Sequence, residues 1–332
     1  MIRNYLTVTL RNLRKNKVHS LINVTGLAIG MACAILILLW VRDELGYDRF
    51  HADAGRVVRV YRDETATAPG SGSALTSPPM AAAFKKDFPE VLLATRFGTW
   101  QRRLVGNGDK TFTETRYMHV DPDFFEMLTF PFVKGDPRTA LSEPNSIVLT
   151  ESAAAKYFGT GDPMGRTLTV DRAFDVVVTG VVQDPPSNSS LRFDLLSPFK
   201  LLLTKYLDEE SDGNWGFNSF TTLLLLAPDV ETADFNAKLE GYLQRYDEDD
   251  TDRLAVQPLT AVHLRSFMGH DNLGTSGIKY VWIFTALAFF ILAIASINFM
   301  NLTTARSARR APTTASSSPN PSLWPSSPSG WP

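Results

Sequence analysis

The chain of 332 residues is poor in cysteine and histidine, and it carries almost no net charge. Its single cysteine, Cys33, rules out an intrachain disulfide, so a folded domain here must rely on an ordinary hydrophobic core. The formal net charge of −2 gives no indication of a nucleic-acid partner. The histidines are scattered, without the spacing of metal ligands: His19, His51, His119, His263 and His270.

The common motifs of catalytic sites are missing as well. The sequence has no G-x-x-x-x-G-K-[ST] phosphate loop, no G-x-S-x-G elbow, no H-E-x-x-H helix and no C-x-x-C pair. The segment 106–111 resembles a phosphate loop only in composition. An acidic run could hold a hard cation but lacks the glycine and spacing of a calcium loop, which favours a solvated turn: Asp247, Glu248, Asp249, Asp250 and Asp252. We therefore expect no catalytic residue, no cofactor and no metal site.

Two long apolar runs are present, and each is free of charged residues. The first extends from Leu21 to Val41 and the second from Tyr280 to Ala305. Each would reach roughly 30 Å or more as a helix, enough to cross the core of a bilayer. A cleaved signal peptide is the alternative for the first run, but the run is long for one and no small-x-small cleavage site follows it.

Basic residues flank both runs on the side away from the block between them. Five precede the first run and three follow the second: Arg3, Arg11, Arg14, Lys15, Lys17, Arg306, Arg309 and Arg310. The positive-inside rule then predicts cytoplasmic chain ends and an external block from Arg42 to Lys279. An apolar stripe through Ile2, Leu6 and Leu13 further predicts an amphipathic helix over residues 1–19 on the inner leaflet.

The block between the apolar runs predicts a mixed α+β domain, in two lobes. Runs rich in β-branched and aromatic residues predict strands at Arg56–Tyr61, Ser146–Thr150, Arg166–Val170, Phe174–Val182 and Phe220–Ala227. Capping residues and apolar stripes predict three helices. Asp121 would cap the first, Asp123–Leu128, and Thr232 would cap the last, Ala233–Tyr246. The middle helix, Glu151–Phe158, would be capped by Thr150 and closed by Gly159. The two kinds of element do not alternate regularly, so a parallel βαβ sheet is not expected.

The apolar runs contain residues suited to helix packing. Gly26, Gly30 and Ala34 recur at intervals of four, giving a face along which another helix can approach closely. Asn298 and Asn301 put amides one turn apart on the second run, where lipid cannot satisfy them. Because two spans offer few internal partners, we expect a dimer or a larger assembly.

A family resemblance runs through most of the chain. It begins with Leu10-Arg11-Asn12-Leu13, Gly26-Leu27-Ala28-Ile29-Gly30 and Tyr47-Asp48-Arg49-Phe50-His51, and continues through Val120-Asp121-Pro122-Asp123-Phe124-Phe125. It is densest at Ser146-Ile147-Val148-Leu149-Thr150-Glu151-Ser152 and ends with Ile297-Asn298-Phe299-Met300-Asn301-Leu302. On these segments the chain resembles the N-terminal part of MacB/FtsX-like ABC transporter permeases.

The resemblance implies an architecture and a set of partners. Together with the residue patterns above, it predicts a cytoplasmic amphipathic helix at 1–19, a transmembrane helix at 20–41, a periplasmic MacB-like core domain at 42–279, a second transmembrane helix at 280–305 and a cytoplasmic end at 306–332. The protein would be a non-catalytic permease subunit in the bacterial inner membrane, working with a separate cytoplasmic ABC ATPase, a second permease copy, membrane lipid and a periplasmic adaptor, but with no nucleic acid. Such permeases export or extrude a substrate or remodel the envelope.

The sequence departs from the family pattern after Ala311. Residues Pro312–Pro332 contain no charge and are dominated by proline and serine. We expect a truncated permease whose tail is translated out of frame, or else a disordered cytoplasmic tail. The alternative function is a two-pass membrane sensor or envelope-binding protein with an external ligand domain.

Overall fold

The computed structural model describes residues 17–63, 72–98, 102–108, 110–248, 250, 252–266, 268, 271, 273 and 276–308. The chain divides into two compact units. One, here called the helix pair, comprises the described residues up to Leu38 and from Phe284 onward; the other, the central domain, extends from Leu39 to Ile283. Most of the predicted amphipathic helix and the whole tail from Pro312 lie outside the described residues.

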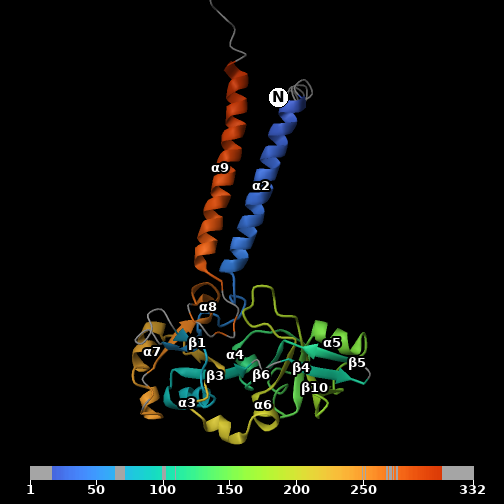
Figure 1. Ribbon diagram of the computed structural model, residues 1–332, viewed down its shortest axis with the longest axis vertical. Coiled ribbons are helices and arrows are strands. Elements are labelled where there is room, and N and C mark those ends of the chain that lie inside the picture. Colours follow the sequence, from blue (N-terminus) through green and yellow to red (C-terminus); the bar gives the residue numbers. More distant parts are fainter. Residues whose placement is uncertain are drawn as a thin grey trace, which may run out of the picture. The chain divides into compact units, whose positions relative to one another are not determined.

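Two long helices cross from one unit into the other. Helix α2 spans Lys17–Leu45 and helix α9 spans Ile278–Ala308. Within the helix pair they lie side by side, as the blue and orange helices of Figure 1 show. The segments Val24–Leu45 and Ile278–Asn298 are long and apolar enough to cross a membrane, judged by length and composition. The last residues of α2, from Leu39, and the first residues of α9, up to Ile283, belong to the central domain.

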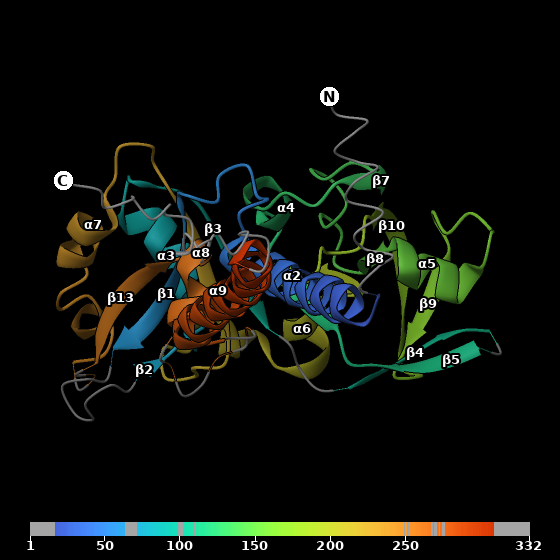
Figure 2. The ribbon, with the colours of Figure 1, turned by 90° about the horizontal axis from the view of Figure 1, so that it is seen from above.

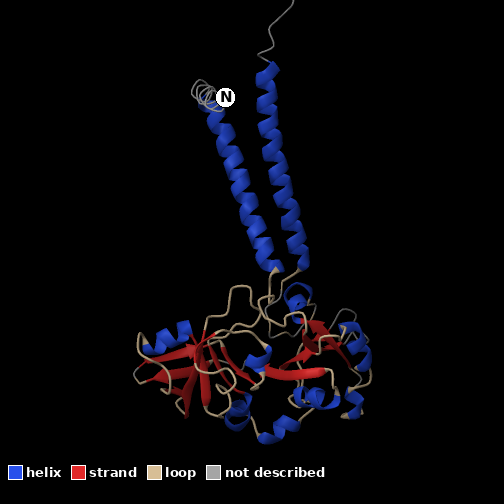
Figure 3. Ribbon diagram, turned by 180° about the vertical axis from the view of Figure 1, so that it is seen from behind, coloured by secondary structure: helices blue, strands red, loops and turns tan. Residues whose placement is uncertain are grey.

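The central domain is built on one mixed sheet of 13 strands, drawn in red in Figure 3. The order of the main path is β13-β1-β12-β3-β6-β11-β8-β10-β9-β4-β5, and β2 pairs with β1 while β7 pairs with β10. The strands are β1 Val57–Asp63, β2 Gly72–Ser73, β3 Val91–Gly98, β4 Arg103–Asn107, β5 Lys110–Glu114, β6 Tyr117–Val120, β7 Phe132–Lys134, β8 Ser146–Thr150, β9 Thr167–Val170, β10 Phe174–Val182, β11 Leu195–Pro198, β12 Thr221–Leu226 and β13 Arg253–Pro258. Among the described strands, β8–β10 and β6–β11 are the parallel pairs and the others are antiparallel, so the fold is α+β as the sequence predicted.

Short helices pack against this sheet. They are α3 Met80–Asp87, α4 Phe124–Met127, α5 Glu151–Phe158, α6 Phe199–Tyr206, α7 Thr232–Lys238 and α8 Leu259–Arg265, with two 3-10 turns, η1 Glu209–Gly213 and η2 Leu243–Arg245. Helix α5 begins and ends as predicted. The Thr150 hydroxyl accepts from the Ala153 amide at 3.2 Å, and Gly159 adopts a φ of 62° at the other end.

Separate hydrophobic cores fill the two ends of the sheet. Around α3 and α7 one core contains Phe84, Phe88 and Phe235; around α5 another contains Tyr157 and Val176. A third cluster, rich in phenylalanine, lies between them under strands β6, β8 and β11: Phe97, Phe124, Phe125, Phe130 and Phe193. Burial of these side chains, each worth roughly 1.5–3 kcal/mol, stabilises the domain without any disulfide.

Two of the predicted helices differ from the structure. The predicted helix Ala233–Tyr246 ends at Lys238, because the chain turns at Gly241 with a φ of 67° before η2. Its first residue is Thr232, and no side chain caps it. Asp121 does not cap α4 either: its carboxylate accepts from the Arg96 amide at 2.9 Å instead. A turn therefore ends α7 early, and a tertiary hydrogen bond takes the Asp121 carboxylate away from α4.

Candidate functional site

The helix-packing residues predicted from the sequence lie in the helix pair. A Cβ added at Gly30 would stand 3.1 Å from the Ala295 Cβ, and one at Gly26 would stand 3.9 Å from Asn298 Nδ2. Ala34 and Ala288 are the only buried residues among the described side chains of this unit. The small-residue face of α2 therefore faces α9 of the same chain.

The predicted packing role of the two asparagines of α9, Asn298 and Asn301, is not visible in the structure. Asn298 is exposed, and its amide makes no hydrogen bond to the side chains that the structure describes. Asn301 lies in α9, but its side chain is outside the described part of the chain. Packing of these residues against a second copy stays a prediction.

The end of α2 is fixed to the central domain by α8. The Glu44 carboxylate lies 2.8 Å from His263 Nε2, and the ring of Tyr47 stacks on the His263 imidazole with centroids 3.4 Å apart. Both side chains are largely buried, with exposed fractions of 13% for Glu44 and 9% for His263. The contact therefore joins the end of α2 to α8 in a place that water reaches poorly.

The next turn of chain is fixed to the loop between β10 and β11. Asp48 has a φ of 56°, a left-handed conformation that aspartate tolerates better than most residues. Its amide donates to the Asn188 carbonyl at 2.9 Å, and its carboxylate accepts from the Ser190 amide at 2.8 Å. Burial raises the pKa of the Asp48 carboxyl, although the bonds from Ser190 oppose this. Asn188 in turn donates to the Gly46 carbonyl at 3.1 Å.

His51 forms a third contact, with the loop after α4. Its Nδ1 accepts from the Thr129 amide at 3.1 Å, and the Thr129 hydroxyl accepts from the Ala52 amide at 2.9 Å. The ring packs between Phe50 and Phe130. Burial lowers the pKa of His51 to about 4, so the imidazole is neutral at physiological pH.

The segment leading to α9 returns to the same helix α8. The Ser276 amide donates to the His263 carbonyl at 2.6 Å. His263 thus touches both connections of the central domain to the long helices, with its side chain on one and its backbone on the other. We call this set of contacts, centred on Glu44, Tyr47, Asp48 and His263, the junction.

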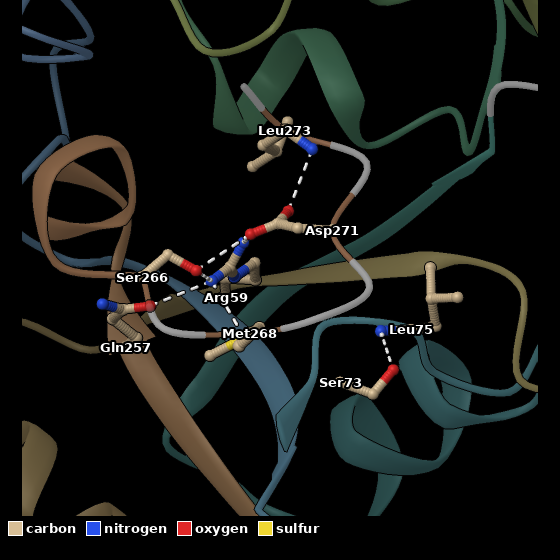
Figure 4. Close-up of polar contacts among 8 residues, drawn as sticks. All are labelled: Arg59, Ser73, Leu75, Gln257, Ser266, Met268, Asp271 and Leu273. Atoms are coloured by element: carbon tan, nitrogen blue, oxygen red, sulfur yellow. Dashed lines mark hydrogen bonds and ion pairs between the residues drawn. The ribbon is translucent and has the colours of Figure 1, made fainter. Parts of the chain in front are cut away.

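A buried arginine holds the same returning segment to the sheet (Figure 4). Arg59 in β1 is fully buried and donates to Asp271 at 2.6 Å and to the Ser266 hydroxyl at 3.1 Å. Gln257 and the Met268 sulfur lie within 3.2 Å of the same guanidinium. Removing either member of such a pair would leave a buried charge without compensation.

Sequence reasoning missed the junction. The segment Tyr47–His51 drew attention only through the family resemblance, and no role for these side chains followed from it. The sequence predicted a solvated turn at the acidic run, whereas Asp250 and Asp252 accept hydrogen bonds from Arg62 in β1 at 2.7 and 2.9 Å. The segment that resembled a phosphate loop is the turn between β4 and β5.

Elsewhere, the described residues contain no cluster of three or more His, Cys, Asp or Glu side chains placed to hold a metal ion. A cleft of about 520 Å³ opens beside α6, where Arg96 stacks on Phe199 at 3.9 Å and pairs with Asp121 and Asp212. The junction is the more complete arrangement, because each of its polar groups links two elements.

The sequence matches the family described as the MacB-like periplasmic core domain over residues 20–242. The chain belongs to this family. The match begins in α2 and takes in most of the central domain.

Many solved structures are similar to the chain, including the following three. A domain of a protein described as a permease from Porphyromonas gingivalis is 24% identical, with a TM-score of 0.54 over 63% of this chain and 92% of that one. The periplasmic region of MacB from Actinobacillus actinomycetemcomitans is 15% identical, with a TM-score of 0.47 over 63% and 91%. The extracellular domain of the noncanonic ABC-type transporter YknZ from Gram-positive bacteria is 13% identical, with a TM-score of 0.42 over 60% and 99%. No curated protein matches the chain.

Proposed function

We propose that the protein is the permease subunit of a MacB/FtsX-like ABC transporter and that it does mechanical rather than chemical work. In this proposal a separate cytoplasmic ATPase moves the two long helices, and the central domain, on the far side of the membrane, responds. The work would be export, extrusion of a substrate or remodelling of the envelope. The family membership and the two apolar helices support this proposal.

The junction is the observation that carries it. Glu44 lies at the end of α2 and Ser276 just before α9, yet both bind His263 in α8. A displacement of either long helix would therefore act on α8, which packs on β1 and β13. Rigid elements joined by packed and hydrogen-bonded contacts can transmit a displacement in this way.

Purification of the full chain from bacterial membranes in mild detergent tests the proposal. An ATPase should co-purify, and its ATP hydrolysis should respond to variants of the junction. Glu44→Ala and His263→Ala should each uncouple hydrolysis from changes in the central domain, while Glu143→Ala, on an exposed loop, should leave it unchanged. If no ATPase accompanies the chain from its native membrane, the permease proposal is wrong.

A two-pass sensor or envelope-binding protein is the second candidate. The cleft beside α6 favours it, because its volume lies within the range of small-ligand sites. A small molecule that stabilises the purified chain without any ATPase, and loses this effect in Phe199→Ala, would favour this candidate.

A further inference from the structure

The two edge strands of the sheet, β13 and β5, differ in whether their outer side is covered. At one end, β13 is protected by a side chain: the Asn236 amide accepts from the Val256 amide at 2.6 Å and donates to the Val256 carbonyl at 3.3 Å. At the other end, β5 pairs only with β4, and no described strand lies on its outer side (Figure 2). Exposed strand edges readily pair with other strands. The uncovered edge of β5, at the opposite end of the sheet from the covered edge of β13, is therefore a candidate site for pairing with another strand.

The outward groups of β5 can be identified from the register. Asn107 pairs with Lys110 across a two-residue connection, which makes them a hydrogen-bonded pair, and such pairs alternate along an antiparallel ladder. Lys110, Phe112 and Glu114 therefore bond to β4, while the amides and carbonyls of Thr111 and Thr113 face outward. Both threonine side chains are exposed.

The sequence of β5 is complementary to itself when it is turned around. Lys110-Thr111-Phe112-Thr113-Glu114 aligned antiparallel with a second copy places Lys110 opposite Glu114, Thr111 opposite Thr113, and Phe112 opposite itself. Opposite-charge, threonine and aromatic pairs are the cross-strand pairs that stabilise sheets. The twofold axis falls at Phe112, so the outward groups of Thr111 meet those of Thr113 and form four backbone hydrogen bonds.

We propose that β5 pairs with β5 of a second copy of this chain, which joins two central domains through their sheets. The inference rests on the proposed permease function and on the dimer or larger assembly that the sequence predicts, and it says where two central domains meet. Lys110 is exposed and makes no ion pair with the described residues, so its ammonium is available to the second copy. Glu114 is 3% exposed and binds Lys156 at 2.6 Å, so the backbone bonds and the threonine pairs carry most of the contact.

The contact is suited to copies that are already held together. Two five-residue strands cover much less than the roughly 1,200 Å² of a stable interface between free proteins. Copies tethered in one assembly have a high effective concentration, and a contact too weak for free domains can then form. Isolated central domains should accordingly remain monomeric while the full chain pairs.

Disulfide trapping in native membranes tests the register. Two differently tagged full-length copies, both with Cys33→Ala, carry Thr111→Cys and Thr113→Cys respectively. Directly opposite residues in an antiparallel pair lie about 5.5 Å apart at Cα, which is within disulfide range. Oxidation should link the two tags several-fold more than it links two copies that both carry Thr111→Cys, since those cysteines are two residues out of register.

The matched control uses Thr167→Cys in one copy and Thr169→Cys in the other. These threonines are also exposed and two residues apart, but they lie on β9, which is paired on both sides by β10 and β4. The molecular mass of the complex in detergent reports separately whether two copies assemble at all.

The outcomes separate the two proposals. Selective linking of Thr111→Cys to Thr113→Cys supports pairing through β5. A dimeric mass with no more linking than the β9 control overturns the β5 contact and leaves the permease proposal standing. A monomeric mass overturns both the assembly and the contact. A disulfide to a different protein shows that another strand occupies this edge and overturns pairing with a second copy.

Discussion

Single residues at the junction are held in conformations and protonation states that cost free energy. Asp48 takes a left-handed conformation and buries a carboxylate, and His51 buries a neutral imidazole. Each cost is offset by hydrogen bonds to a backbone amide more than 70 residues away in the chain. Residues of this kind fix the position of one segment against another and do not stabilise the chain locally.

The pH dependence of stability should reveal His51. Its pKa is lowered from 6.5 in the unfolded chain to about 4 in the folded protein, so the unfolded state binds more protons between these values. Stability therefore falls as pH falls below 6.5, and His51 should account for a loss of about 2 kcal/mol by pH 5. His51→Asn keeps an acceptor for Thr129 but cannot titrate.

Chemical denaturation of the wild type and His51→Asn at pH 7 and pH 5 measures this contribution. The difference between the two proteins should be smaller at pH 5 or reverse in favour of the variant. An equal loss of stability in both proteins on acidification would show that His51 is protonated in the folded state without cost.

Gly30→Leu should disturb the approach of α2 to α9. The added side chain begins 3.1 Å from the Ala295 Cβ, and overpacking of this kind costs about 1–3 kcal/mol. In a Cys33→Ala background, disulfide formation between Gly26→Cys and Asn298→Cys reports the approach of the helices. Gly30→Leu should slow it several-fold, and Ala28→Leu, at an exposed position of α2, should not.

At the scale of whole elements, the sequence predicted the bounds of β8, β10 and α5 but not the end of α7. The bounds of β8 and β10 are those expected, because runs of β-branched residues bounded by turns carry the strand signal locally. Helix α7 was predicted too long because the apolar stripe continues through Leu239, Tyr242 and Leu243, all buried, while the backbone turns at Gly241. Burial alone does not distinguish a helix from a turn followed by η2.

The connection between α2 and the central domain can be tested at Asp48. Asp48→Ala removes the acceptor for the Ser190 amide and keeps a left-handed backbone that alanine adopts poorly. We expect a loss of about 2 kcal/mol in the free energy of unfolding, mostly from the unpaired Ser190 amide. Asp48→Asn retains the acceptor and the backbone preference and removes a buried charge.

Asp48→Asn should therefore be at least as stable as the wild type at pH 7. Unfolding of the full chain in detergent by denaturant, followed by tryptophan fluorescence, measures both variants. Equal stability of Asp48→Ala and Asp48→Asn would mean that the Ser190 contact does not fix this connection.

At the scale of the whole molecule, the sequence predicted the α+β class and the two apolar helices but not the site. The junction brings Glu44 to a residue 219 positions away, and no periodicity or motif in a single sequence encodes such a contact. The order of strands is equally nonlocal, since β1 lies between β12 and β13. Local patterns determine which segments are strands, and packing of the hydrophobic cores determines where the strands lie.

Topology is the remaining property of the whole chain that the sequence predicts and labelling can test. The basic residues before α2 and at the end of α9 predict cytoplasmic ends and a central domain outside. In a Cys33→Ala background, Thr167→Cys lies at an exposed position of the central domain, and Ser307→Cys lies near the end of α9. In whole cells, an impermeant thiol reagent should label Thr167→Cys only, and permeabilised cells should allow both to react. Equal labelling of both variants in intact cells, or labelling of Ser307→Cys alone, would contradict this orientation and the permease proposal that depends on it.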